Sequence, residues 1–520
     1  MDVVSYLEVN ACLPNDLSIY FWLIHGPTGS NLMSIVSSSV AEQAKSTPQQ
    51  QRWLGAKITP SLIVLGVFIC LWFIPAPEGL SPKAWNLFAI FLCTILAIVL
   101  KPLPMGAVAL LSVAACTLTK TLTIEESLTS FSSHMIWLVL ISFLLARGFI
   151  KTGLGTRIAY HFVYFFGKST LGMSYGLVLT EALLSPFIPS TTARGAGIIF
   201  PIVLSLSKEF GSDPANNTQR KVGAFLMAVC FHTNVITSTL FLTAMAANPI
   251  IAGFALEFGV NMTWINWAKA TIVPGVISLI AMPLIVYFTY PPEIKKTPAA
   301  KEFAEQKLAE MGKLSFNEII MLGTFGLLLV LWVFGSYLSI NATVAALAGL
   351  SILLITGVLD WDDVLDEKNG WNTFIWLTIL LNLSNYLAKF GLMIWFGDKM
   401  QNIVAGYSWP IALSALLLVY YYSHYLFASL TAHITSLYSA MTVVAIACGA
   451  PGELVAYLFA FFSSLCAAFT HYGTGAAPVY YGANYVPFAI WWKIGAILGV
   501  AYILIWGVLG SAWLNLLGMW

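Results

Sequence analysis

Long stretches of apolar residues, almost free of charge, recur from residue 58 to the end of the chain. Runs of about 17 to 25 such residues are long enough to cross a bilayer as helices. The composition agrees, because 59% of the residues are hydrophobic and 9% are charged, whereas about 25% are charged in a typical soluble domain. The sequence therefore predicts an all-α polytopic protein embedded in the lipid bilayer.

Charge, cysteines and motifs argue against several other classes of protein. The formal net charge is +1, which predicts no binding of nucleic acid. Six of the seven cysteines lie in apolar segments without CxxC spacing, so we expect no disulfide, no metal site and no other cofactor. An intramembrane enzyme is the alternative of another class, although the chain has neither an HExxH motif nor a pair of aspartates in an apolar stretch.

Two of the apolar segments are interrupted by short polar stretches of one design. The first reads Ser190-Thr191-Thr192-Ala193-Arg194. The second begins 239 residues later and reads Ser429-Leu430-Thr431-Ala432-His433. The apolar runs on either side are too short for two crossings, so we predict re-entrant hairpins over residues 168–208 and 408–450. Such irregular backbone survives at membrane depth only where it is buried in protein or lines a watery cavity.

The same offset relates other segments and indicates a duplication. Ile-Trp-Leu at 136–138 falls on Ile-Trp-Leu at 375–377, and His232 falls on His471. We predict a leader of unknown role at 1–52, a first helix with repeat 1 at 53–290, a charged cytoplasmic linker at 291–313 and repeat 2 at 314–520. This leader is either dispensable, or Met33 is the true initiator and the residues before it are not translated. Each repeat has an odd number of crossings, so repeat 2 is inverted, giving about 11 transmembrane helices and two hairpins.

Lysine and arginine predict the orientation of the chain. Most of them fall on predicted inner loops, whereas five fall on predicted outer loops, namely Lys83, Lys120, Lys269, Lys389 and Lys399. Because basic residues concentrate on the cytoplasmic side, we expect the N-terminus inside and the C-terminus outside.

The polar stretches at the hairpin tips predict an anion site. A helix that starts at a tip points its free N–H groups, and roughly half a positive charge, toward the tip. Two tips that enter from opposite faces can hold the two carboxylates of one small dicarboxylate. The alternative is that Ser and Thr only satisfy kinked backbone. The candidate substrate-binding residues are Ser190, Thr191, Thr192, Ser429, Leu430 and Thr431.

A basic residue follows each tip. Arg194 and His433 hold equivalent places, and a charge inside the membrane marks function by default. The alternatives are a structural clamp, in which Arg194 pairs with Glu181 or with carbonyl groups, and a hydrogen-bonded core histidine at 433. We also predict a break in the helix that follows each hairpin. Each break either completes the site or is a simple kink. The residues concerned are His232, Thr233, Asn234, His471, Tyr472, Gly473 and Thr474.

The tip stretches, together with Thr470-His-Tyr-Gly-Thr-Gly-Ala-Ala-Pro478, resemble the divalent anion:sodium symporter (DASS, sodium:sulfate symporter type) family. Within it they resemble the branch of 2-oxoglutarate/malate translocators and citrate/succinate and tartrate/succinate antiporters. The resemblance implies a homodimeric elevator-type transporter. It places the protein in a bacterial inner membrane or, alternatively, a plastid inner envelope.

Family tips typically read Ser-Asn-Thr, contact the substrate carboxylates and lie beside sodium-binding loops. Here both asparagines are absent. Arg194 and His433 are therefore expected to act as fixed cations in place of sodium. We expect sodium-independent exchange of small dicarboxylates such as 2-oxoglutarate, malate, succinate and fumarate, with tartrate and citrate as further candidates. A sodium-coupled di/tricarboxylate symporter is the alternative.

Overall fold

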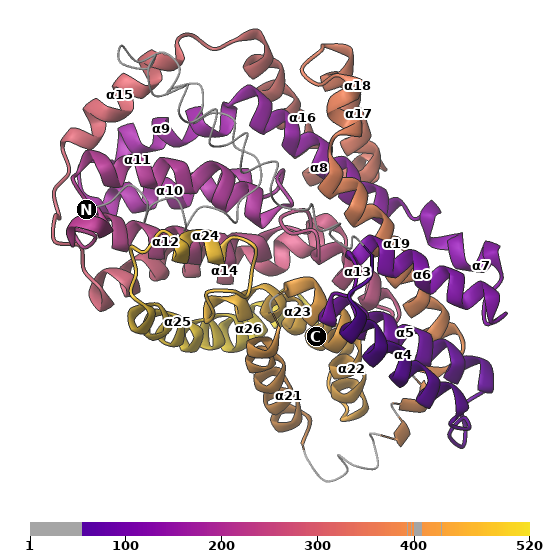
Figure 1. Cartoon of the computed structure of the whole chain (residues 1–520). Coiled ribbons are helices and arrows are strands. Elements are labelled where there is room, and N and C mark those ends of the chain that lie inside the picture. Colours follow the sequence, from indigo (N-terminus) through magenta and orange to yellow (C-terminus); the bar gives the residue numbers. More distant parts are fainter. Residues whose placement is uncertain (1–54, 393, 397, 400–407, 428) are drawn as a thin grey trace, which may run out of the picture. The chain divides into compact units, whose positions relative to one another are not determined.

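The structure is a computed structural model that describes residues 55–392, 394–396, 398–399, 408–427 and 429–520. Residues 57–520 form one compact unit. Throughout these ranges the regular elements are helices (Figure 1). The predicted leader at 1–52 lies outside the described residues.

Seven helices of the described residues are long and apolar enough to cross a membrane. They span Pro82–Leu100, His134–Thr152, Gly223–Leu240, Trp264–Thr289, Phe316–Gly335, Leu430–Ala447 and Phe488–Leu516. Five shorter apolar helices accompany them. The prediction of an all-α polytopic membrane protein is confirmed.

The helices form two series with the same order of elements. After α4 (Ile58–Phe73), the first series is α5 (Pro82–Leu100), α6 (Met105–Leu118), α7 (Ile124–Leu128), α8 (His134–Thr152), a hairpin, the pair α12 (Gly223–Leu240) and α13 (Asn248–Leu256), and α14 (Trp264–Thr289). The second is α16 (Phe316–Leu338), α17 (Ala342–Ile355), α18 (Trp361–Leu365), α19 (Lys368–Lys389), a hairpin, the pair α23 (Gly452–Leu465) and α24 (Ala477–Gly482), and α25 (Phe488–Tyr502) continued by η6 (Ile503–Leu509) and α26 (Gly510–Leu516). Even the short helices α7 and α18 correspond, since both start with a capping box.

Both polar stretches lie at the tips of helical hairpins. The first hairpin consists of α10 (Thr170–Leu184), the π-helical η2 (Ala193–Ile199) and α11 (Phe200–Glu209). Pro186 and Pro189 follow α10 directly and stop it from continuing, because proline lacks an N–H group. The second hairpin consists of α21 (Trp409–Ser423), η4 (His424–Leu426) and α22 (Leu430–Ala447).

The break predicted at 232–234 is in the wrong place. These residues lie inside α12, and the helix is interrupted at 241–247 instead. Every residue of α12 is buried, and the Thr233 hydroxyl donates to the carbonyl oxygen of Val229 at 2.8 Å. The Thr233 and Asn234 side chains are satisfied without unwinding the backbone. In the second repeat, the interruption between η5 (Cys466–Ala468) and α24 does include residues 471–474.

The linker contains α15 (Ala299–Met311), which packs on α9 (Leu154–Phe166). The sequence analysis did not predict α9. Arg157 of α9 fixes the end of the linker. Its Nε lies 2.5 Å from Glu318 Oε1, and its Nη1 donates to the Gly312 carbonyl at 2.9 Å.

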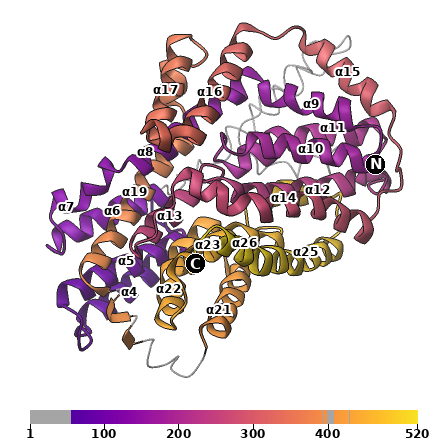
Figure 2. The same ribbon diagram turned by 180° about the vertical axis from the view of Figure 1, so that it is seen from behind.

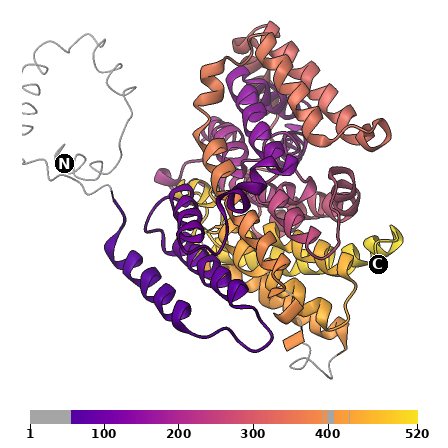
Figure 3. The ribbon, with the colours of Figure 1, turned by 90° about the vertical axis from the view of Figure 1, so that its right-hand side faces the viewer.

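Helices α4 to α8 and α16 to α19 gather on one flank, and the hairpins with α12, α14 and α25 lie on the other, as the opposite views in Figures 1 and 2 show. Figure 3 shows α4 and α5 along the edge of the first group. An ion-pair cluster ties α8 to α18 within this group. Asp363 contacts Lys151 Nζ and accepts from Arg147 Nε at 3.0 Å.

Candidate functional site

The two tips have the same local structure. In the first, the helix resumes at Thr191 after an irregular stretch, and Ser190 Oγ accepts a hydrogen bond from the Ala193 N–H at 3.1 Å. In the second, Ser429 Oγ accepts from the Ala432 N–H at 3.4 Å. Both serines therefore cap a helix whose first N–H groups point toward the tip. The predicted equivalence of Ser190 and Ser429 has a structural counterpart in these caps.

Both tips border one cavity of about 310 Å³, a volume within the usual range of small-molecule sites. Its lining residues come from the two tips, from the interruptions that follow α12 and η5, and from α8. They are Phe143, Pro189, Ser190, Thr191, Met245, Ala246, Ala247, Ser429, Leu430, Thr431, Thr474 and Gly475. The structure thus brings together five of the six residues predicted to bind substrate, along with Thr474.

Thr192 is the sixth, and it lies beside the cavity. A Cβ atom added to Gly475 would be 2.2 Å from Thr192 Oγ1. The first tip and the irregular segment of the second repeat therefore meet at a contact that admits only glycine at position 475.

Arg194 is fully buried and does not line the cavity. Its Nε lies 2.7 Å from Glu181 Oε1, and its Nη1 donates to the carbonyl oxygens of Ile188 at 2.5 Å and Ala244 at 2.9 Å. Its Nη2 donates to Thr237 Oγ1 and Ser238 Oγ. This is the clamp that the sequence left open as the alternative. The charge of Arg194 is offset by Glu181, so the expected net positive charge at the tip is not found in this arrangement.

Asn234 completes the clamp. Its Nδ2 donates to Glu181 Oε1 at 2.6 Å and to the Thr191 carbonyl at 3.1 Å. Of the residues predicted at 232–234, Asn234 therefore supports the first tip directly. His232 packs against the ring of Phe231 and Thr233 bonds within its own helix, so neither reaches the cavity.

His433 occupies the place in the second hairpin that Arg194 has in the first. It is fully buried, and its Nε2 lies 3.0 Å from both the Tyr420 carbonyl and Ser423 Oγ. A carbonyl only accepts hydrogen bonds, so Nε2 carries a proton. The other ring nitrogen faces Cys466 Sγ at 3.9 Å. No carboxylate approaches this imidazole among the hydrogen bonds and ion pairs of the described residues.

The remaining predicted residues support the irregular segment at 469–476. Tyr472 donates to the Tyr425 carbonyl at 3.0 Å, and the Gly473 carbonyl lies 3.1 Å from His424 Nε2. The ring of His471 lies against Tyr481. These contacts hold the segment in place beside the cavity, although the three residues are not part of its lining.

The sequence analysis missed six lining residues, namely Phe143, Pro189, Met245, Ala246, Ala247 and Gly475. A signal for the last four exists in two similar strings, Ala246-Ala247-Asn248-Pro249 and Ala476-Ala477-Pro478. In each, proline stands in the first turn of a helix, which starts just after the interruption. Matching these strings instead of His232 with His471 would have located both interruptions.

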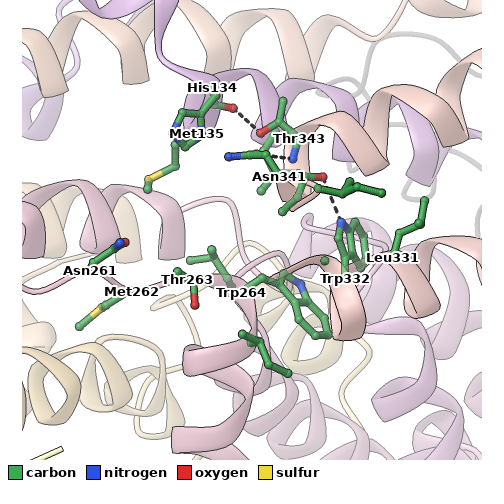
Figure 4. A pocket seen from close by; sticks show the side chains of 16 residues that line it. His134, Met135, Asn261, Met262, Thr263, Trp264, Leu331, Trp332, Asn341 and Thr343 are labelled. Carbon is green, nitrogen blue, oxygen red and sulfur yellow. Dashed lines mark hydrogen bonds between the residues drawn. The ribbon is translucent and has the colours of Figure 1, made fainter. Parts of the chain in front are cut away.

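A second cavity, of about 270 Å³, lies between the ends of α8, α14, α16 and α17 (Figure 4). Figure 4 shows the Thr343 hydroxyl directed at the His134 carbonyl and the Trp332 indole at the Ala342 carbonyl. The Trp264 indole donates to Thr243 Oγ1, and the lining of this cavity includes neither hairpin tip.

The family described as the sodium:sulfate symporter transmembrane region matches residues 55–520. The chain belongs to this family. Among its relatives, "Putative malate transporter YflS" of Bacillus subtilis is 53% identical over 89% of this chain and 97% of its own length. "Dicarboxylate transporter 1, chloroplastic" of Spinacia oleracea is 48% identical over 91% of this chain and 84% of its own.

The fold of this family member also has a solved counterpart. The YdaH transporter of Alcanivorax borkumensis aligns with a TM-score of 0.53, covering 88% of this chain and 98% of that one. The identity is 11%, so the likeness concerns the fold alone.

Proposed function

We propose that this protein is a secondary active transporter that exchanges small dicarboxylates such as malate, 2-oxoglutarate, succinate and fumarate. The observation that supports this proposal most directly is that both hairpin tips border one cavity, and each tip is a helix start capped by serine. Helix starts and hydroxyl groups are good partners for carboxylates. The names of the malate and dicarboxylate transporters among the relatives support the same substrate class.

The lining suits a dicarboxylate in its middle as well as at its ends. Ser190 and Thr191 lie at one tip, and Ser429 and Thr431 at the other. The lining also includes the apolar side chains of Phe143, Met245, Ala246 and Leu430, which fit a short carbon chain. Leu430 therefore contributes by apolar contact.

Sodium independence is part of the proposal. In the first hairpin the guanidinium of Arg194 already binds two carbonyl oxygens and two hydroxyls, and hard cations use oxygen ligands of this kind. Arg194 then replaces a cation as a hydrogen-bond donor, without adding net charge. The role of His433 as a second fixed cation stays a prediction.

We infer obligate exchange from the cost of moving the carrier across the membrane without substrate. Without substrate, the N–H groups and hydroxyls at the tips would cross the membrane without partners, and each unmade hydrogen bond costs about 1 to 3 kcal/mol. A bound dicarboxylate satisfies them in both directions. Empty return is therefore slow relative to return with substrate.

We further propose elevator movement of the hairpin-bearing group against α4 to α8 and α16 to α19, within a homodimer in the bacterial inner membrane or a plastid inner envelope, with the N-terminus inside. Of the twelve lining residues, Phe143 alone comes from the group formed by α4 to α8 and α16 to α19. The cavity can therefore travel with the hairpins while little else is disturbed.

An enzyme on this fold has one sequence match in its favour, Gly172-Met-Ser-Tyr-Gly176, which fits the GxSxG pattern. Ser174, however, is buried within α10, and its hydroxyl donates to the Leu171 carbonyl. A nucleophile elbow requires a serine exposed at a strand-to-helix turn. This match does not support a hydrolase.

Proteoliposomes test the proposal. Uptake of labelled malate should require an internal dicarboxylate and should not change when sodium is replaced by choline. Thr431→Ala should slow it about tenfold or more, whereas Thr435→Ala, one turn away and outside the cavity lining, should not. Sodium-driven uptake into empty vesicles would establish the symporter instead.

A further inference from the structure

Three metal-ligating side chains meet in the second repeat, outside the cavity lining. They are His424 of η4, His433 of α22 and Cys466 of η5, all fully buried. One ligand atom from each lies within 4.8 Å of the others. The sequence predicted no such site, because these residues are far apart along the chain and lack ligand spacing.

Hydrogen bonds prepare both imidazoles as ligands. The Nε2 of His433 donates to the Tyr420 carbonyl at 3.0 Å, and that of His424 donates to the Gly473 carbonyl at 3.1 Å. Each ring therefore carries its proton on Nε2 and keeps a lone pair on Nδ1. The Nδ1 of His424 is buried without a hydrogen-bond partner. A ligating histidine typically donates its other N–H to a carbonyl in this way.

The spacing also suits a metal ion. His433 Nδ1 lies 3.9 Å from Cys466 Sγ. Two ligands bound at about 2.0 and 2.3 Å lie roughly 3.5 to 3.8 Å apart. The ligand atom of His424 lies within 4.8 Å of those of His433 and Cys466, so it would approach by about 1 Å to reach this spacing.

We propose that His424, His433 and Cys466 form a buried site for one monovalent copper ion. Thiolate and imidazole ligands suit Cu(I). On binding, the Cys466 thiol releases its proton to solvent and forms the Cu–S bond, so that the ion and the thiolate cancel in charge. A divalent zinc ion would leave one net positive charge in a dry site, which is costly. The site joins the second hairpin to the segment containing Gly473, and occupancy restrains the hairpin.

Copper binding to the purified full chain tests this site. Cys12, Cys70 and Cys448 are replaced by serine, so that the remaining thiols are buried ones. Titration with Cu(I) against a chromogenic chelator should give one ion per chain. His424→Gln and Cys466→Ser should each weaken binding more than about 100-fold, since even outer partners of ligands are worth about 10- to 100-fold. Cys230→Ser, a change at an equally buried thiol in α12, should leave it unchanged.

X-ray absorption of the copper-loaded protein gives an answer that does not depend on any variant folding. One sulfur and two nitrogen ligands are expected, at distances close to the zinc values of about 2.3 and 2.0 Å. A spectrum without sulfur, failure to retain copper, or binding that survives Cys466→Ser would overturn the site. Tighter binding of zinc than of Cu(I) would overturn the assignment to a monovalent ion. None of these outcomes depends on dicarboxylate exchange.

Discussion

The two hairpins present the same tip but support it by different means. Each tip is a serine that caps the next helix, with alanine three residues later. Behind the first tip stands a charged clamp of Arg194, Glu181 and Asn234. Behind the second stands a clasp formed by His433, whose Nε2 lies against the Tyr420 carbonyl among aromatic rings.

The difference separates what a ligand touches from what holds it in place. Residues that border the cavity are constrained by the ligand, and the two repeats share the capping serine there, although Thr191 corresponds to Leu430. The supporting residue must only satisfy nearby carbonyls, and either a guanidinium or an imidazole does so. The energetic consequences differ, because a buried ion pair broken on one side leaves an uncompensated charge, whereas a lost neutral hydrogen bond does not.

The largest expected effect is therefore on the first hairpin. Arg194→Ala should lower the free energy of unfolding by about 3 to 5 kcal/mol and abolish exchange, because Glu181 is left buried without its partner. His433→Ala should cost about 1 to 3 kcal/mol. Thermal unfolding in detergent compares the two variants, and equal losses would contradict the distinction between clamp and clasp.

A double variant isolates the charge. Glu181→Leu combined with Arg194→Met removes both charges and should recover part of the stability lost in Arg194→Ala, since an apolar replacement of a buried pair is often tolerated. Recovery should be incomplete, because the carbonyls of Ile188 and Ala244 lose their donor. No recovery at all would show that the carbonyl contacts dominate.

The contact between the repeats ranks next. Gly475→Ala should cost about 1 to 3 kcal/mol by overpacking and slow exchange, because the new methyl group meets Thr192 Oγ1. Adding Thr192→Ala should relieve part of the loss. Gly482→Ala is the matched control, because nothing lies within 4 Å of a Cβ atom there. An unchanged exchange rate in Gly475→Ala would contradict the close contact of Thr192 with position 475.

The shared tips should respond alike. Ser190→Ala and Ser429→Ala each remove a cap worth about 1 kcal/mol and a hydroxyl at the cavity, so each should raise the Kd for malate about tenfold or more. Isothermal titration measures this. Ser436→Ala in α22 serves as the control, since that hydroxyl bonds to the Ala432 carbonyl and lies outside the cavity lining. An effect confined to one tip would break the equivalence.

The smallest effect is expected far from the tips, at Asp363. Burial alone would raise the pKa of this carboxyl, but hydrogen bonds from Lys151, from the Asp360 backbone and from Arg147 lower it from 3.8 to about 2. The stabilisation is therefore complete above about pH 4 and is lost as the pH falls through about 2. Asp363→Asn should cost about 1 kcal/mol or less, because Lys151 is partly exposed.

Between pH 5 and 8 the unfolding temperature of Asp363→Asn should stay below that of the wild type by a constant amount. A difference that changes across this range would show that the carboxyl titrates near neutrality.

The sequence by itself determined the membrane class, both hairpins and the equivalence of their tips. Hydropathy, proline positions and the fixed offset between the two repeats can be read from the sequence without knowing which residues are in contact in the folded protein. For the same reason Ser190, Thr191, Ser429, Leu430 and Thr431 could be assigned to one site. The predicted domain boundaries and the orientation of the termini stay predictions.

Only the tertiary structure decided where side chains point. Arg194 turns away from the cavity because Glu181, the hydroxyls of α12 and the Ala244 carbonyl surround it. Thr233 and Asn234 stay helical because their hydrogen-bond partners lie inside the protein. His424, His433 and Cys466 become neighbours through packing of three separate elements. Each outcome depends on which distant residue completes a hydrogen bond or fills a space, and local sequence pattern carries no record of that.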